Sequence, residues 1–475
     1  MHSVKILVAV LLFVFAGAAV LVSVAVTTPM YTARAGRACD NCHVTPNNWV
    51  DPQLSDRKCT LSCQGCHVDP AGGGMRNVVG RFYGRSTLPM IATSPRPTAD
   101  WDRNAPYLGR RDRATTYTDT LPLGPDTYEQ VFAYADSVDD RWAWGTPAAE
   151  PTRYGYWPGR YGGLRADPVF RVGFDVRLAT LLSGTALVFP MQADVSSVLH
   201  PVRHVTLFAN VGARGRPSGY SDTFDDDHSP YLREALLMLH EAPYQAYIKA
   251  GRFVPAFGLR LDDHTSRIRR EFGLDGALPE SRVTGVEMGA APNYPVINVS
   301  WFRMASRTRA PDAWDIFDHD DGWGAAANLG WRDMGWSFGG SGLWRRRPVD
   351  EGGNTSTFGV WGSFNPWHYF RNVPLTYQAE FDYGRYQRAS GLESEKAAAY
   401  QELNWLAFNG INFLVAYDWA DPDREVKDDE SHRFQIGGQV IVVPGVTLDG
   451  RLRALIPTTN EGSDADLFLQ LHLWY

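Results

Sequence analysis

Two copies of one five-residue pattern contain four of the five cysteines in this 475-residue chain. The pattern reads CDNCH at residues 39–43 and CQGCH at residues 63–67. A pair of cysteines with two residues between them can bind zinc, close a disulfide or anchor a haem through thioether bonds. Twenty residues separate Cys42 from Cys63, a spacing that also fits a four-thiolate zinc site. The cysteines alone therefore leave three chemistries open.

The histidine directly behind each cysteine pair favours covalent haem. In the C-x-x-C-H pattern the cysteines attach to the porphyrin, and the adjacent histidine ligates the iron. A zinc site would give His43 and His67 no role, and its thiolates would have to survive in an oxidising compartment. We therefore expect two c-type haems as cofactors, bound by Cys39, Cys42, His43, Cys63, Cys66 and His67.

The second axial ligand of each iron has few candidates. Between residues 36 and 199 the only histidines are His43 and His67, so another histidine would have to come from further along the chain. Met75 and Met90 are the nearby methionines, of which Met75 is the candidate distal ligand, and the alternative role of both is to fill apolar gaps. No role is predicted for Cys59. The candidate histidines beyond this region are His200, His204 and His264.

The N-terminus predicts export from the cytoplasm. A short polar head with Lys5 precedes an apolar run at residues 6–26, and residues 33–35 form an A-x-A-like cleavage site. We expect residues 1–35 to be a signal peptide, with the mature chain beginning near Gly36. The alternative is a retained anchor, because 21 apolar residues are enough to span a bilayer. Either arrangement places the cysteine motifs where c-type haem is attached.

The rest of the chain divides into three zones. Residues 36–88 form the expected dihaem cytochrome c segment. Residues 89–166 are rich in Pro, Arg and Asp with little periodicity, which predicts an irregular linker or lumen plug. Over residues 167–475, segments of roughly ten aromatic and β-branched residues alternate with turn residues. The formal net charge of -7 argues against a nucleic-acid partner.

Two segments of the third zone show strict alternation of apolar and polar residues. In FRVGFDVRL (170–178) the apolar side chains alternate with Arg171, Asp175 and Arg177. In LTYQAEFDY (375–383) the alternating polar positions are Thr376, Gln378, Glu380 and Asp382. A soluble sandwich would bury the apolar face, whereas an outer-membrane barrel would turn it toward lipid. The alternation alone leaves both arrangements open.

The spacing of turns favours the barrel. Even-numbered strands end in tight links such as Asn409-Gly410 and Pro444-Gly445, whereas odd-numbered strands more often lead into long polar loops, near residues 215–229, 258–281, 307–320 and 420–430. The final segment, LFLQLHLWY, ends on the aromatic Tyr475 and resembles the assembly signal of outer-membrane barrels. We predict an outer-membrane antiparallel β-barrel of about 16 strands, mainly β in class. The candidate strands begin near residues 168, 185, 202, 230, 244, 282, 295, 321, 334, 354, 373, 396, 410, 431, 445 and 464.

A cytochrome segment followed by such a barrel resembles the fused cytochrome–porin family of iron-oxidising and other electron-exchanging bacteria. The specific matches are the two C-x-x-C-H motifs and the C-terminal strand; iron-oxidising members carry one haem motif, and this chain has two. The resemblance implies an outer-membrane electron conduit whose haem segment lies on the periplasmic side or plugs the lumen. Its partners would be membrane lipid, a periplasmic electron carrier and an extracellular redox partner such as iron or another cytochrome.

Other functions fit the same motifs. One is a porin-like channel with a redox-sensing or structural plug that holds haem or zinc. A second is a periplasmic cytochrome anchored in the inner membrane, and a third is a peroxidase-like enzyme with a five-coordinate haem. We expect an electron-transfer protein rather than a catalyst of bond chemistry, because the iron itself changes oxidation state.

Overall fold

The computed structural model describes part of the N-terminal region and most of the strand region. The described residues are 67–70, 74–76, 91 and 170–475, without 203, 214–230, 243–245, 262–264, 275–280, 292–294, 305–321, 333–335, 348–352, 367–373, 388–391, 409, 444 and 459–463. The first C-x-x-C-H motif, the cysteines of the second and Cys59 lie outside these residues. Within the described residues, no helix is both long and apolar enough to cross a membrane.

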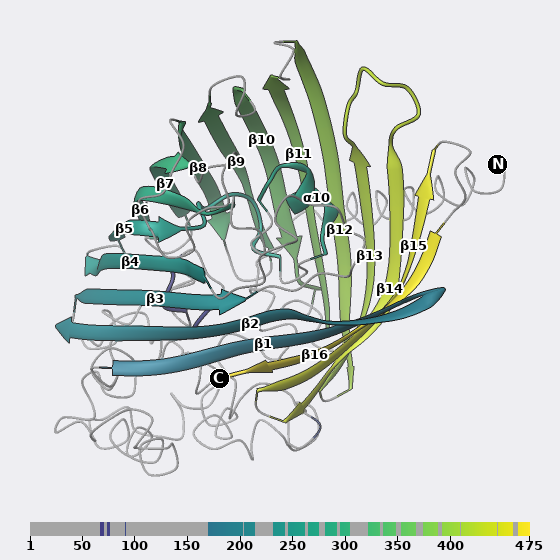
Figure 1. The fold of residues 1–475 in the computed structure, drawn as a ribbon, viewed down its shortest axis with the longest axis horizontal. Coiled ribbons are helices and arrows are strands. Elements are labelled where there is room, and N and C mark those ends of the chain that lie inside the picture. Colours follow the sequence, from purple (N-terminus) through teal and green to yellow (C-terminus); the bar gives the residue numbers. More distant parts are fainter. Residues whose placement is uncertain are drawn as a thin grey trace, which may run out of the picture.

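Sixteen strands form one closed antiparallel barrel (Figure 1). Each strand pairs with its sequence neighbour, and β1 pairs with β16 to close the sheet. The predicted strand starts all lie within three residues of the observed ones, so the predicted fold class is confirmed. The strands are β1 (Phe170–Ser183), β2 (Thr185–Val202), β3 (Val205–Ala213), β4 (Tyr231–Ala242), β5 (Ala246–Phe253), β6 (Val283–Ala290), β7 (Pro295–Met304), β8 (Trp323–Arg332), β9 (Trp336–Arg346), β10 (Thr355–Phe364), β11 (Leu375–Gln387), β12 (Glu393–Phe408), β13 (Ile411–Asp421), β14 (Ser431–Val443), β15 (Val446–Pro457) and β16 (Asp464–Trp474).

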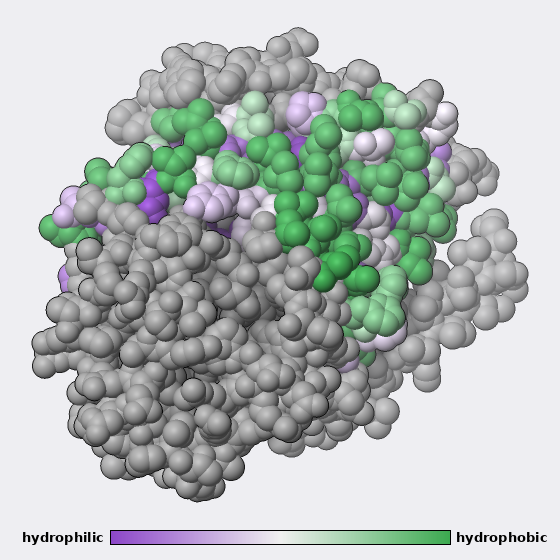
Figure 2. Space-filling view, turned by 90° about the horizontal axis from the view of Figure 1, so that it is seen from below, coloured by the Kyte–Doolittle hydropathy of each residue, from purple (hydrophilic) through white to green (hydrophobic). Residues whose placement is uncertain are grey.

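The two faces of the sheet follow the alternation in the sequence. Phe170, Val172 and Phe174 are 59%, 46% and 45% exposed, whereas Arg171 and Arg177 are buried. In β11 the predicted polar positions 376, 378, 380 and 382 are all buried on the inner side. Figure 2 shows hydrophobic side chains gathered on the outer surface of the strands. The apolar face is therefore outside, which excludes the soluble sandwich and places the barrel in an outer membrane, in contact with lipid.

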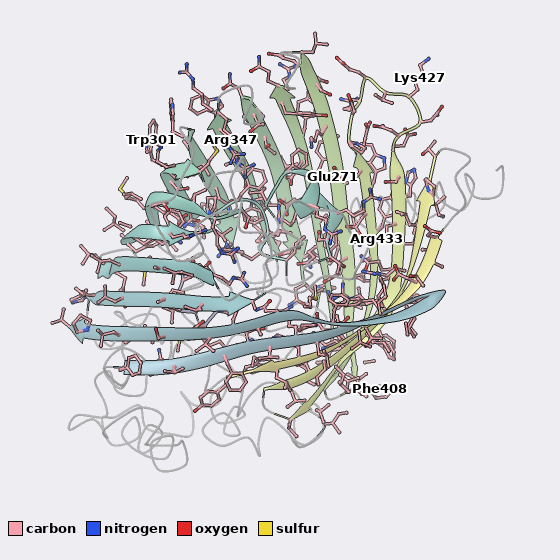
Figure 3. All side chains as sticks on the ribbon, viewed as in Figure 1. Glu271, Trp301, Arg347, Phe408, Lys427 and Arg433 are labelled. Atoms are coloured by element: carbon pink, nitrogen blue, oxygen red, sulfur yellow. The ribbon has the colours of Figure 1, made fainter. Side chains whose placement is uncertain are left out.

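Aromatic side chains cluster near both ends of the barrel. Near the long loops, the rings of Trp301 and Trp323 stack with centroids 4.7 Å apart. Near the short turns, Trp405 and Phe413 have ring centroids 5.9 Å apart. Figure 3 shows Trp301 and Phe408 on the outside of the barrel at opposite ends. Two aromatic belts that flank an apolar band are typical of barrels that sit between two membrane interfaces.

The links between strands differ at the two ends. Gly410 and Gly445 have φ values of 76° and 78°, which a tight two-residue turn requires and which glycine adopts without steric cost. Both glycines lie in short turns that the sequence predicted. Long loops follow odd-numbered strands, also as predicted. The link after β1 is an exception, because Gly184 alone joins β1 to β2. Short turns mark the periplasmic end of bacterial barrels. Phe170 and Tyr475 therefore lie at the periplasmic end.

The loop between β5 and β6 departs from the prediction. The sequence indicated a long polar loop at residues 258–281, grouped with the outer loops. The loop is long, but its described residues 254–261 and 265–274 fold into the lumen and include a short helix, α10 (Arg267–Glu271), seen inside the barrel in Figure 1. We call these described residues the lumen loop. Its polar backbone groups find partners on the inner wall of the barrel, so solvent is not required to satisfy them.

Candidate functional site in the barrel lumen

The described residues after the second cysteine motif form a small two-stranded ladder, which we call the motif ladder (residues 67–70 and 74–76). His67 and Arg76 form an antiparallel bridge, and the Val68 N–H donates to the Met75 carbonyl oxygen at 3.0 Å. Gly74 turns the chain back with a φ of 59°. The His67, Val68 and Met75 side chains are all buried. The predicted role of His67 as a haem ligand stays a prediction.

The motif ladder contacts the inner wall at the periplasmic end of β1 and β16. The Arg76 guanidinium lies over the Trp474 ring, 3.8 Å from its centroid. The Arg171 Nη1 donates to the Arg76 carbonyl oxygen at 3.5 Å. Met75 packs against Gly173, since a Cβ added to this glycine would lie in van der Waals contact with Met75 Cγ at 3.4 Å and would clash with the Tyr475 carbonyl oxygen at 2.7 Å. These contacts join the ladder to the strands that close the barrel.

A buried ion pair joins the other side of the motif ladder to β5 and β6. Lys249 Nζ lies 3.0 Å from Asp69 Oδ1 and 3.0 Å from Glu287 Oε1. The side chains of Lys249 and Glu287 are fully buried, and that of Asp69 is 8% exposed. The Tyr247 hydroxyl and the Ala256 N–H also donate to Glu287, at 2.8 Å and 3.2 Å. The Glu287 carboxylate thus binds both strand β5, through Tyr247 and Lys249, and the start of the lumen loop, through Ala256.

The arrangement of the ladder bears on the predicted haem ligands. Consecutive residues of an antiparallel ladder point to opposite faces, and the bridge pairs His67 with Arg76 and Val68 with Met75. Met75 therefore lies on the face opposite to His67 and packs against Gly173. The roles of His67 as proximal ligand and of Met75 as distal ligand stay predictions, and the contact with Gly173 also suits Met75 to the packing role that the sequence left open. The assignments of Cys39, Cys42, His43, Cys63 and Cys66 stay predictions.

Three histidines gather near the periplasmic ends of β2, β3 and β4. The Thr206 hydroxyl lies 2.9 Å from His200 Nδ1 and 2.8 Å from His240 Nε2. His204 Nδ1 lies 3.2 Å from the His240 carbonyl oxygen. The sequence suggested His200 and His204 as candidates but missed His240, because the apolar sequence around it did not indicate that its side chain faces the lumen. His264 lies outside the described residues. Within the described part of the chain, no three His, Cys, Asp or Glu side chains are arranged to hold a metal ion.

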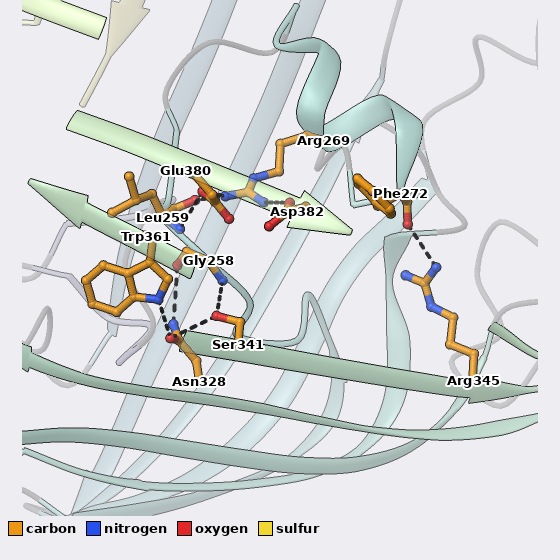
Figure 4. Close-up of polar contacts among 10 residues, drawn as sticks. All are labelled: Gly258, Leu259, Arg269, Phe272, Asn328, Ser341, Arg345, Trp361, Glu380 and Asp382. Carbon is orange, nitrogen blue, oxygen red and sulfur yellow. Dashed lines mark hydrogen bonds and ion pairs between the residues drawn. The ribbon is translucent and has the colours of Figure 1, made fainter. Parts of the chain in front are cut away.

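The lumen loop is held to the opposite wall by a cluster of carboxylates and guanidinium groups. Arg269 of α10 forms ion pairs with Glu380 and Asp382 of β11, the latter at 3.5 Å between Nη1 and Oδ2. The Leu259 N–H donates to Glu380 Oε2 at 3.0 Å, and the Gly258 N–H donates to Ser341 Oγ at 2.8 Å. Figure 4 shows these contacts converging on the loop. The inward polar face of β11 therefore has a structural function in seating this loop.

Basic side chains of the wall bind carbonyl groups on both sides of α10. After the helix, Arg345 donates to the Phe272 and Gly273 carbonyl oxygens at 3.0 Å and 3.1 Å. Carbonyl groups at the C-terminal end of a helix lack partners within the helix and attract cations, which explains this contact. Before the helix, Arg433 donates to the Thr265 carbonyl oxygen at 2.8 Å and pairs with Asp418 at 2.8 Å. In Figure 3, Arg433 points into the barrel.

Electrostatics reinforce the anchoring of α10. Burial lowers the pKa of Arg269, but the Glu380 and Asp382 carboxylates raise it by more, so that the net pKa is above the ordinary value. For Arg267, burial dominates and lowers the pKa despite the neighbouring Glu271. Arg269 is therefore held as a cation by its two carboxylate partners. These pairs could not be predicted from local sequence, because their members are more than one hundred positions apart.

The comparisons with known proteins concern the barrel. Neither a protein-family model nor a curated protein sequence matches the chain. Among solved structures, the chain is similar to OprB of Pseudomonas putida, at 12% identity and a TM-score of 0.49 over 68% of this chain and 98% of that one. It is also similar to a loop L8 deletion mutant of OmpT of Vibrio cholerae, at 10% identity and a TM-score of 0.49 over 64% and 99% of the two chains. An anion-selective porin from Comamonas acidovorans aligns at 9% identity and a TM-score of 0.45 over 64% and 99%.

Proposed function

We propose that this protein is an outer-membrane electron conduit that passes electrons between a periplasmic carrier and an extracellular donor or acceptor. Its cofactors are two covalent c-type haems, one held by Cys39, Cys42 and His43 and the other by Cys63, Cys66 and His67. The haems supply a change of oxidation state at iron, and the protein supplies ligation, spacing and insulation. The extracellular partner is iron or another cytochrome.

The observation that carries the proposal is the contact of the motif ladder with the inward-facing wall. His67 is buried, and Asp69, two residues further on, pairs with Lys249 of β5. A haem attached at residues 63–67 would then lie beside the barrel interior rather than in the periplasm. Because the apolar band of an outer-membrane barrel is only ~25 Å tall, two haems cover a large part of that distance.

The residues of this chain have distinct tasks in such a conduit. His67 would hold iron, and Arg76 on the same face of the ladder offers a guanidinium suited to a propionate carboxylate. Met75 packs the ladder against Gly173, which fixes its distance from the wall. The outward apolar face seats the barrel in lipid, so the path for electrons runs through the polar interior. Electron transfer then requires no acid, base or nucleophile from the chain.

The first test is spectroscopic. The full chain is produced in a host that matures c-type cytochromes, purified from the outer-membrane fraction, and its haem is counted per chain by the pyridine haemochrome method. We expect two haems, one after Cys63 and Cys66 are replaced by serine, and one after Cys39 and Cys42 are replaced. Zinc in place of haem would refute the proposal.

The second test measures transfer across a membrane. The protein is inserted into liposomes that enclose a redox dye, and a membrane-impermeant reductant is added outside. Reduction of the enclosed dye is expected for the chain with both haems. Its rate should fall to that of empty liposomes in each single-motif variant. Equal rates in all variants would show that electrons do not pass through the haems.

A porin-like channel with a redox-sensing or structural plug is the second candidate. The observation that favours it is the lumen loop, which narrows the barrel without needing a cofactor and is lined by charged side chains such as Arg269 and Arg433. Such a channel would pass ions in a planar bilayer with either oxidation state or no haem bound. Conductance without transmembrane dye reduction would favour it over the conduit.

A further inference from the structure

We infer that Asp69, Lys249 and Glu287 form a buried latch that seats the motif ladder inside the barrel and keeps the lumen closed to ions. The inference deepens the proposed function and rests on it in one respect: the segment that the latch holds is the one expected to carry the second haem.

The latch joins residues that are remote in sequence. Asp69 and Lys249 are 180 positions apart, and Lys249 Nζ contacts both oxygens of the Asp69 carboxylate, at 3.0 Å and 3.2 Å. Glu287 lies directly across from Lys249 in the β5 and β6 register. The wall therefore presents a lysine with its own carboxylate partner, and the motif ladder adds a second carboxylate. Asp69 can therefore bind Lys249 while the pair between Lys249 and Glu287 stays intact.

Burial makes this contact demanding. The Lys249 side chain has no exposed surface, and its ammonium also lies 4.6 Å from the centre of the Phe253 ring. A buried ammonium is tolerated only when carboxylates or other acceptors surround it. When the motif ladder leaves the wall, water must replace the Asp69 carboxylate beside the Lys249 ammonium. Withdrawal of the ladder therefore requires water to enter the lumen. Seating the ladder and closing the lumen are thereby coupled.

The Glu287 carboxylate of the latch also holds the lumen loop. Glu287 accepts hydrogen bonds from the Ala256 N–H at 3.2 Å and from the Tyr247 hydroxyl at 2.8 Å, and Asn298 donates to Tyr247 at 2.7 Å. The motif ladder and the lumen loop, two described segments inside the barrel, thus meet at the Lys249 and Glu287 pair of the wall. A change at Glu287 would loosen both, whereas a change at Asp69 would loosen only the ladder. Asp69 is therefore the position at which the latch can be tested alone.

The test is ion conductance in planar bilayers, measured on the full chain with its haem content determined in parallel. The wild type is expected to be nearly closed, and Asp69→Asn is expected to raise the mean conductance at least tenfold. Asp69→Asn leaves the Lys249 and Glu287 pair in place, so the barrel should assemble, which heat-modifiable gel migration checks. Asp69→Glu keeps the charge and should restore most of the closure.

A matched control comes from another buried ion pair of the inner wall. Asp194 and Arg233 pair at 3.0 Å with both side chains about as buried as the latch residues. Asp194→Asn removes a carboxylate within the wall, and its conductance should stay at the wild-type level. If Asp69→Asn fails to assemble, a triple variant that combines Asp69→Asn, Lys249→Gln and Glu287→Gln neutralises every charge of the latch at once, leaves no lone charge among the three, and should open the lumen too.

The outcomes separate the latch from the conduit. A wild type as open as a porin, or Asp69→Asn as closed as the wild type, overturns the latch even if both haems are present and electrons pass. Opening in Asp69→Asn but not in Asp194→Asn supports the latch. Should that opening occur in a chain that contains no haem, the seating is correct and the electron conduit is not.

Discussion

Replacing Arg269 with methionine should release the lumen loop from the wall. Arg269 is the partner of both Glu380 and Asp382, whose side chains have no exposed surface, and it also donates to the Leu259 carbonyl oxygen. Removing one member of a buried ion pair costs about 3–5 kcal/mol, because the remaining charge is left uncompensated. At 1.4 kcal/mol for each tenfold change, the equilibrium between seated and released loop should shift by roughly 10²- to 10³-fold toward release.

The assay combines stability and access. Urea unfolding in lipid vesicles gives the loss of free energy, and hydrogen exchange at residues 254–274 shows whether the loss is local to the lumen loop. Arg269→Lys keeps the positive charge but loses the planar guanidinium that donates to two partners at once. The free energy of unfolding of this variant should therefore lie between those of Arg269→Met and the wild type. Neutralising the acceptors with Glu380→Gln and Asp382→Asn should recover much of the loss caused by Arg269→Met. A loss below about 1 kcal/mol, or no recovery in the combined variant, would refute the anchoring role.

Three further outcomes follow from the same contacts. Met75→Leu should leave the absorption spectrum and the reduction potential of both haems unchanged, because Met75 faces Gly173 and not His67; a shifted potential would restore Met75 as a distal ligand. Val360→Arg, in the middle of β10 on the lipid face, should lower barrel stability by about 2–4 kcal/mol in urea unfolding, whereas Val360→Leu should not. Burial, with the neighbouring carboxylates of Asp421 and Glu430, raises the pKa of Asp429 in the outer loop at residues 422–430. Above this raised pKa the negative charge of Asp429 destabilises the folded loop. This destabilisation disappears as the pH falls through the raised pKa, because the carboxyl group then becomes protonated. Asp429→Asn should therefore protect this loop from proteolysis at neutral pH and leave its protection unchanged in acid.

The barrel was predictable because its pattern is local. Alternation at residues 170–178 and 375–383 assigns each side chain to one of two faces, and a strand needs no knowledge of distant residues to show it. Tight turns such as the one at Gly445 fixed where strands begin, since a positive φ demands glycine there. What alternation could not decide was which face is inside. The closed sheet, with Phe170 outside and Arg171 inside, decides it.

The lumen contents were not predictable from local pattern. The loop at residues 258–281 has the polar, turn-rich composition of an outer loop, and contacts with distant wall residues, such as the pairing of Arg269 with carboxylates on β11, hold its described part inside. Likewise, nothing near Asp69 in the sequence indicates Lys249 as its partner. The candidate ligand Met75 was chosen by proximity in sequence, and its contact with Gly173 on β1 is a tertiary contact that no local pattern indicates. Long-range ion pairs and ladder register are tertiary properties.

The charges on the inner wall bear on which proposed function the barrel suits. A solute channel needs inward charges that remain solvated, so that they attract and release what passes. Here Glu380, Asp382, Asp418 and Glu287 have side chains with no exposed surface, and each has a partner in the lumen loop, in α10 or on the wall. Those carboxylates are committed to holding protein inside the barrel. An electron conduit tolerates this, because electrons need fixed cofactor spacing and an insulating wall but no aqueous path. If the chain instead proves to conduct ions, some of these pairs must exchange with water, and neutralising Arg269 or Lys249 would then change ion selectivity as well as stability.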